Sequence, residues 1–124
     1  MSRGRIITLP KRGEVYLIKF DPTIGAEIRK TRPGLIIQND LSNQSSPVTI
    51  VAAISSKFTL PLHPTEVLIN STEGGLTRDS VVLCNQIRTV DKQRLTKRIG
   101  KIQSTLMGEV DSALSISLGL RYLS

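Results

Sequence analysis

The sequence predicts one mainly β domain, in which short strands form a small barrel that is followed by a C-terminal helix. Three observations support this prediction: short apolar runs, connections too short to hold crossover helices, and a change of apolar spacing near the C-terminus. The chain has 124 residues, of which 39% are hydrophobic and 22% charged. This size and composition fit a single domain over residues 1–124.

Five or six segments have the composition of β-strands. They are residues 14–20, 33–38, 48–55, 65–69, 80–84 and a last stretch near 96–102. The run 48–55, VTIVAAIS, is continuously apolar, which indicates a central strand. Because most connections are turns too short for a crossover helix, we expect a mainly antiparallel sheet.

The segments between the expected strands are rich in turn formers and predict loops. These loops are 21–32, 39–47, 56–64 and 70–79. The first exceeds the usual length of a connection, and long loops on compact domains are often functional. Residues 1–12 lack apolar periodicity and are expected to form a mobile basic arm.

The last part of the chain has the spacing of a helix. One helical face would carry Leu106, Met107, Val110, Ala113, Leu114 and Leu118. Ser104 is the expected N-cap. This face is expected to pack on the barrel, with part of a dimer interface as an alternative use.

The charge of the chain favours an anionic partner. There are 17 basic and 10 acidic residues, which gives a net charge of +7. Such a balance suits nucleic acid or an acidic protein segment. Aromatic residues make up only 3%, with no tryptophan, which argues against a wide base-stacking platform.

Other features of the sequence indicate the cellular compartment and limit the kinds of catalytic site. No apolar run approaches the roughly 20 residues that span a membrane, and no signal peptide is evident, so we expect a cytoplasmic protein. The single Cys84 excludes an internal disulfide and is expected to be half-buried. With only His63 and scattered acids, the sequence offers neither a histidine pair nor a metal cluster, and no cofactor is expected.

Arg32 is the residue whose setting most suggests a site. Pro33 restricts the backbone of Arg32 to extended conformations, and the guanidinium offers a planar fork that matches phosphate. If residues 33–38 and 48–54 are antiparallel neighbours, Arg32 and Ser55 lie at the same end of the sheet. A hydroxyl from Ser55 or Ser56 would then add one more donor. The sequence therefore predicts a small anion site, with a surface ion pair between Arg32 and Glu27 as the alternative.

RNA suits such a site because it carries its own nucleophile. The 2′-hydroxyl lies beside the phosphate, so its attack is intramolecular. The protein then mainly needs to orient the phosphate and stabilise added negative charge. Two or three preorganised donors would suffice without a metal or a histidine.

The chain resembles the MazF/PemK family, the endoribonuclease toxins of bacterial toxin–antitoxin pairs. The resemblance covers nearly everything from Lys11 onward. It rests on five ordered blocks, KRGEVYLIKFDPTIGAE, TRPGLIIQND, SPVTIVAAIS, RDSVVLCNQIRTVDKQRL and VDSALSISLGL. It implies an SH3-like β-barrel with a terminal helix, a homodimer, and an antitoxin whose acidic flexible segment fills the RNA groove. It also implies sequence-specific, metal-independent cleavage of single-stranded RNA, which leaves 2′,3′-cyclic phosphate and 5′-hydroxyl ends.

By position, the resemblance implies that Arg32 is the catalytic arginine, Ser55 the catalytic hydroxyl and Glu27 the acidic residue of the first loop. Glu27 either orders that loop or holds Arg32. The implied RNA-binding residues are Thr23, Gly25, Gln38, Asn39, Ser56, Lys57, Gln86 and Arg88. Two positions depart from the family pattern, since Ser55 stands where threonine is usual and Asn85 replaces a glutamate.

Two non-catalytic functions remain as alternatives to an endoribonuclease. One is a gyrase-poisoning toxin of the same fold, although those toxins resemble each other through a tryptophan-containing tail that this chain lacks. The other is a basic RNA- or DNA-binding module, a degenerate relative in which Ser55 no longer supports cleavage.

Overall fold

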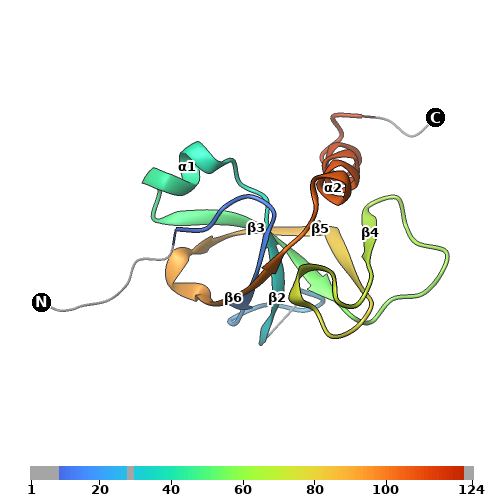
Figure 1. Cartoon of the computed structure of the whole chain (residues 1–124), viewed down its shortest axis with the longest axis horizontal. Coiled ribbons are helices and arrows are strands. Elements are labelled where there is room, and N and C mark those ends of the chain that lie inside the picture. Colours follow the sequence, from blue (N-terminus) through green and yellow to red (C-terminus); the bar gives the residue numbers. More distant parts are fainter. Residues whose placement is uncertain (1–8, 28–29, 122–124) are drawn as a thin grey trace, which may run out of the picture.

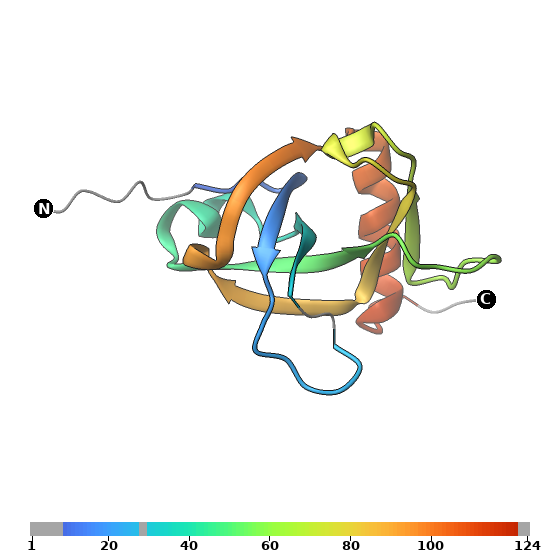
Figure 2. The same ribbon diagram turned by 90° about the horizontal axis from the view of Figure 1, so that it is seen from below.

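Six antiparallel strands form one curved sheet, and a helix packs against it (Figures 1 and 2). The computed structural model describes residues 9–27 and 30–121. The strands are β1 (Glu14–Lys19), β2 (Thr31–Ile36), β3 (Val48–Ser55), β4 (Glu66–Ile69), β5 (Ser80–Asp91) and β6 (Leu95–Lys101). Their order is β4-β5-β3-β2-β1-β6, and α2 (Ser104–Ser117) follows the last strand. The predicted mainly β fold with a C-terminal helix is confirmed.

The barrel is open, because its two edge strands β4 and β6 do not pair with each other. A short 3₁₀ turn, η1 (Glu73–Gly75), packs against β6 instead. The contact is so close that a Cβ on Gly75 would lie 1.8 Å from the carbonyl oxygen of Ile99. Gly75 also has a φ of +79°, which favours glycine. This turn therefore needs a glycine for two separate reasons.

Strand β3 is buried on both faces, as its continuous apolar run predicts. Val51 and Ala53 pack in one cluster with residues of β1, β2 and β5. Ala52 and Ile54 point the other way and belong to the cluster that α2 covers. Alternate residues of one strand thus serve two apolar clusters.

Cys84 belongs to the cluster under α2 and is completely buried, more deeply than the half-buried position expected from the sequence. Burial raises the pKa of its thiol to about 11. The thiol is therefore protonated near neutral pH, and Cys84 contributes as a small apolar side chain.

Helix α2 buries Val110 and Ala113 against the sheet, as predicted, but Leu118 is 60% exposed. Leu118 is exposed because it lies beyond the last helical residue, at the C-cap. The N-cap is Gln103 and not Ser104. The helix ends in a Schellman arrangement, in which Gly119 has a φ of +72° and the Leu120 N–H donates to the Ser115 carbonyl.

The polar segment after β2 contains a helix where a loop was expected. This helix, α1 (Asp40–Ser45), begins after Asn39, whose side chain accepts a hydrogen bond from the Ser42 N–H at 2.8 Å. Asn, Asp and Ser favour turns, but the same residues also favour helix N-caps. The sequence alone did not separate these two uses.

Strand β5 is also longer than expected, since it continues from Ser80 through Asp91. Val90 is buried, and a register shift in the pairing with β3 lies between Ala52 and Ala53. The polar residues from 85 to 89 concealed this continuation. The strand is followed by the 3₁₀ turn η2 (Lys92–Arg94), which leads into β6.

The predicted arm is only partly described, since residues 1–8 lie outside the described part of the chain. The rest of it is firmly attached. Pro10 is buried, and Arg12 donates to the Ile37 carbonyl at 2.7 Å and to Asp111 of α2 at 2.5 Å. The backbone N–H of Arg12 also donates to Asp40, which lowers the pKa of that carboxyl. Pro10 and Arg12 are thus held against the fold.

Candidate active site

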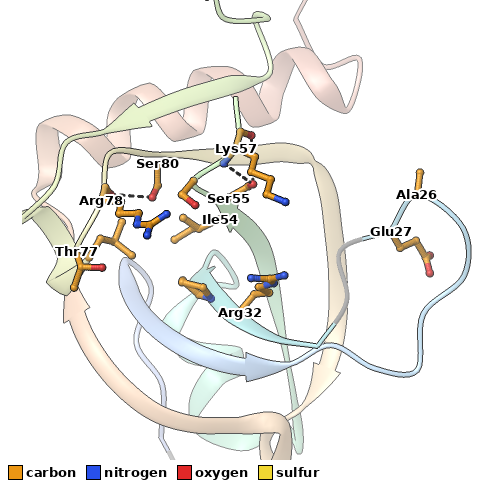
Figure 3. A pocket seen from close by; sticks show the side chains of 12 residues that line it. Ala26, Glu27, Arg32, Ile54, Ser55, Lys57, Thr77, Arg78 and Ser80 are labelled. Carbon is orange, nitrogen blue, oxygen red and sulfur yellow. Dashed lines mark hydrogen bonds between the residues drawn. The ribbon is translucent and has the colours of Figure 1, made fainter. Parts of the chain in front are cut away.

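The pairing of β2 with β3 brings Arg32 and Ser55 to the same end of the sheet, as predicted. Gly34 pairs with Ala53 and Leu35 with Ala52, and Arg32 and Ser55 each lie two residues beyond the last of these pairs, Gly34–Ala53, at the same end. Both residues line one pocket of about 330 Å³ (Figure 3). Arg32 lies at the start of β2 and is exposed, so its guanidinium is accessible to a ligand.

The lining of this pocket is cationic and rich in hydroxyls. Its residues are Ala26, Glu27, Arg32, Pro33, Ile54, Ser55, Ser56, Lys57, Leu76, Thr77, Arg78 and Ser80. The lining thus contains three cations, Arg32, Lys57 and Arg78, and one carboxylate, Glu27. Ile54 and Leu76 provide an apolar floor that strengthens electrostatic contacts. A phosphate fits this combination of charge and donors.

The hydroxyl of Ser55 is held in a local turn with Lys57. Its oxygen accepts from the Lys57 N–H at 3.1 Å, and the hydroxyl donates to the Lys57 carbonyl at 3.3 Å (Figure 3). The second contact is long, so a phosphate oxygen can replace it at little cost. The oxygen is therefore already positioned at the strand end, where a ligand at Arg32 would lie.

The carboxylate of Glu27 orders the loop between β1 and β2. It accepts from the Ile24 N–H at 2.7 Å, while the Glu27 N–H donates to the Ile24 carbonyl at 3.2 Å. In Figure 3 the side chain projects from the loop, apart from Arg32 on its strand. Of the two roles expected for Glu27, the ordering of the loop is the one that these contacts support.

A second pocket, of about 420 Å³, adjoins the first and shares Ala26 and Glu27 with it. It contains Gln86 and Arg88, two of the predicted RNA-binding residues, together with Asn85. The Arg88 guanidinium donates to the Phe20 carbonyl at 2.7 Å and lies 5.6 Å from the Phe20 ring centroid. These contacts fix the position of the Arg88 side chain, so it forms a rigid wall of the pocket.

Gln38 and Asn39 were expected at the RNA groove, and the structure places them elsewhere. They follow the far end of β2 and line neither pocket. The Gln38 side chain is 9% exposed and donates to Asn43 and to the Val48 carbonyl. Asn39 caps α1. Their side chains are thus used inside the fold, at the end of β2 and at the start of α1.

Thr23 and Gly25 lie on the loop that carries Glu27, but they do not line either pocket. The Thr23 hydroxyl donates to Asp21 at 3.4 Å, and Gly25 has a φ of +61°. Any contact of these two residues with a ligand would lie at the rim. Ser56 and Lys57, by contrast, line the first pocket as the prediction requires.

Thr77, Arg78 and Ser80 form another wall of the first pocket, and none of them was predicted as a site residue. Thr77 and Arg78 lie in the segment 70–79, whose Gly-Gly pair predicts a turn, and Ser80 begins the predicted strand 80–84. An arginine beside two hydroxyl residues was the available signal, but only the folded chain brings it near Arg32. Across residues 9–27 and 30–121 no group of three or more metal-binding side chains occurs, and exposed His63 lies outside both pockets.

No helix in the described part of the chain is both long and apolar enough to cross a membrane. Residues 11–118 match the family model described as PemK-like, MazF-like toxin of type II toxin–antitoxin system. The chain is 48% identical to endoribonuclease EndoA of Bacillus subtilis over 110 residues, which covers 89% of this chain and 95% of EndoA.

Solved structures of related proteins have the same fold. MazF of Deinococcus radiodurans superposes with a TM-score of 0.77 at 23% identity, over 90% of this chain and 98% of its own. A mycobacterial endoribonuclease superposes with a TM-score of 0.76 at 23% identity, over 96% of this chain and 100% of its own. Another mycobacterial endoribonuclease, solved with its cognate antitoxin, superposes with a TM-score of 0.74 at 24% identity, over 92% of this chain and 99% of its own. The predicted barrel of the MazF type is thereby confirmed.

Proposed function

The chain belongs to the PemK-like, MazF-like toxin family of type II toxin–antitoxin systems, and from this premise we propose that it is an endoribonuclease that cuts single-stranded RNA. The observation that carries the proposal is the cationic pocket in which Arg32 and Ser55 meet at one end of the sheet. The relative EndoA, which is 48% identical, carries endoribonuclease in its name.

The reaction uses the RNA's own 2′-hydroxyl. The 2′-oxygen forms a bond to phosphorus, the bond from phosphorus to the 5′-oxygen breaks, and the proton lost from the 2′-hydroxyl is balanced by one gained at the 5′-oxygen. The products are a 2′,3′-cyclic phosphate and a 5′-hydroxyl. Positioning the phosphate for this intramolecular step supplies much of the rate.

Arg32 binds the phosphate and stabilises the charge that develops on its oxygens. Arginine stays protonated under all ordinary conditions, so it is a poor general base and a good electrostatic clamp. The Ser55 hydroxyl supplies another donor from the adjacent strand. Lys57 adds positive charge at the same rim. None of these roles requires a metal ion.

The neighbouring pocket with Gln86 and Arg88 takes a base next to the cut site. Its volume of about 420 Å³ and its amide groups suit hydrogen bonding to a base edge. The loop with Thr23 and Gly25 lies at the rim and contacts the RNA strand where the RNA leaves the pocket. Glu27, shared by both pockets, holds this loop in place.

The same cationic surface suits an antitoxin. We infer that an acidic, flexible segment of the antitoxin occupies the pocket and competes with RNA for Arg32 and its neighbours. One structural relative was solved with its cognate antitoxin. We also infer that the toxin works as a homodimer in the cytoplasm, where its RNA and antitoxin are made.

The test is RNA cleavage by the purified protein in excess EDTA. We expect cuts at one recurrent short sequence in a long unstructured RNA, with 2′,3′-cyclic phosphate ends detected by their resistance to ligation until the phosphate is removed. A DNA strand of the same sequence should bind and remain intact. Folded protein without antitoxin that cuts no RNA would overturn the proposal and favour the binding module of the same fold.

Ser55 tests the second donor. We expect Ser55→Ala to slow cleavage about 10²-fold, the usual effect of removing one oxyanion donor. We expect Ser55→Thr to cut faster than the wild type, because the added methyl restricts the rotamer of the hydroxyl. Single-turnover rates measure both effects. An unchanged rate for Ser55→Ala would exclude the hydroxyl from the reaction.

A further inference from the structure

Arg78 is a second arginine of the active pocket, and it reaches the pocket from the side opposite Arg32. It belongs to the segment between η1 and β5, whereas Arg32 starts β2. Figure 3 shows the Arg78 side chain pointing toward the middle of the pocket, with Ile54 between the two arginines and Ser55 to one side, next to Lys57. An anionic strand that crosses this end of β3 would therefore meet a guanidinium on each side.

The backbone around Arg78 is fixed by hydrogen bonds. The buried hydroxyl of Ser80 donates to the Arg78 carbonyl at 3.0 Å (Figure 3). The neighbouring Asp79 accepts from the Ser71 N–H at 2.7 Å, so its carboxylate serves the turn. Neither of the two ion pairs among the described residues includes Arg78. The exposed guanidinium thus keeps its positive charge available to a ligand.

The sheet places the two arginines on opposite sides of β3. β3 lies between β2 and β5, and Ser55 pairs with Val81 of β5. Arg32 lies on β2, whereas Arg78 lies two residues before β5 begins at Ser80. Two cations that enter from either side of β3 can each meet a different phosphate of an RNA strand that crosses it.

We propose that Arg78 binds the phosphate adjacent to the one that is cleaved, so that Arg32 and Arg78 hold two successive phosphates of the RNA across this end of β3. This inference rests on the proposed endoribonuclease function and adds a specific RNA-positioning residue to it. Arg78 acts through binding and does not touch the reacting atoms. Its loss should therefore weaken RNA binding more than it slows the chemical step at saturating protein.

The experiment uses a short RNA with one cut site and a 2′-deoxy sugar at that site, which blocks cleavage. A series of such strands carries one neutral methylphosphonate each, in place of successive phosphates. Dissociation constants are measured for the wild type, Arg78→Ala, Arg32→Ala and Lys97→Ala. Lys97 is an exposed cation on β6 that lines neither pocket, so it controls for the loss of one charge.

We expect Arg78→Ala to bind the all-phosphate strand about 10-fold more weakly, as for a hydrogen bond to a charged group. Neutralising the phosphate next to the cut site should weaken the wild type by a similar factor and should not weaken Arg78→Ala further. For Arg32→Ala, the methylphosphonate that should cause no further loss of binding is the one at the cleaved phosphate. Lys97→Ala should bind like the wild type and respond like it at every position.

Two results would overturn the inference while the proposed function stands. In the first, Arg78→Ala binds RNA as tightly as the wild type. In the second, Arg78→Ala binds more weakly, but every methylphosphonate weakens it as much as it weakens the wild type, or only the methylphosphonate at the cleaved phosphate has no further effect on it. A wild-type protein that cuts none of the matching all-ribose strands would contradict the proposed function itself. The cleavage control therefore separates the two failures.

Discussion

Arg32→Ala should lower the rate of RNA cleavage by about 10³-fold or more, while the protein stays folded. The expected size follows from removing a preorganised cation with several donors from the place where negative charge develops. Arg32 is exposed at the start of β2 and contributes little to packing, so we expect the free energy of unfolding to change by less than about 0.5 kcal/mol. Single-turnover rates and urea unfolding measure the two quantities.

Arg32→Lys is the matched control for this prediction. Lysine keeps the positive charge but loses the planar fork that binds two phosphate oxygens. We expect its rate to fall between those of the wild type and Arg32→Ala, because part of the electrostatic effect remains. Sedimentation should show the same oligomer for all three proteins. Near-normal cleavage by Arg32→Ala would remove Arg32 from the reaction.

Gly75→Ala should destabilise the whole barrel, by more than about 3 kcal/mol. A non-glycine residue in the left-handed region costs about 1–2 kcal/mol, and here the new Cβ would also lie 1.8 Å from the Ile99 carbonyl oxygen. That oxygen belongs to the backbone of β6, so it cannot move without displacing the strand. Urea unfolding at one fixed protein concentration measures the loss, since a dimer makes stability depend on concentration.

Gly119→Ala provides the comparison, because Gly119 also has a positive φ but has no atom within 4 Å of a new Cβ. Gly119→Ala should lower the free energy of unfolding by about 1 kcal/mol, the cost of placing a non-glycine residue in the left-handed region. Equal losses for the two variants would contradict the close contact between η1 and β6. Because Thr77 and Arg78 follow η1 after the single residue Leu76, Gly75→Ala should also impair RNA cleavage more than Gly119→Ala does.

The sequence by itself determined the strands whose burial is simple. The run 48–55 is mostly apolar because both faces of β3 are covered, so local composition carries the signal. Arg32 was found because Pro33 restricts it locally, and its approach to Ser55 followed from antiparallel pairing of neighbouring strands. The resemblance to the MazF/PemK blocks added the role that these two residues are proposed to play.

The tertiary structure decided the features that depend on distant contacts. Gln38 and Asn39 have the polar character of groove residues, but interior hydrogen bonds and the cap of α1 use their side chains. Arg78 resembles an ordinary turn arginine until the curvature of the sheet brings its turn to the pocket of Arg32. Local sequence encodes propensity and periodicity, whereas charge convergence across a pocket arises only when non-adjacent strands and turns meet.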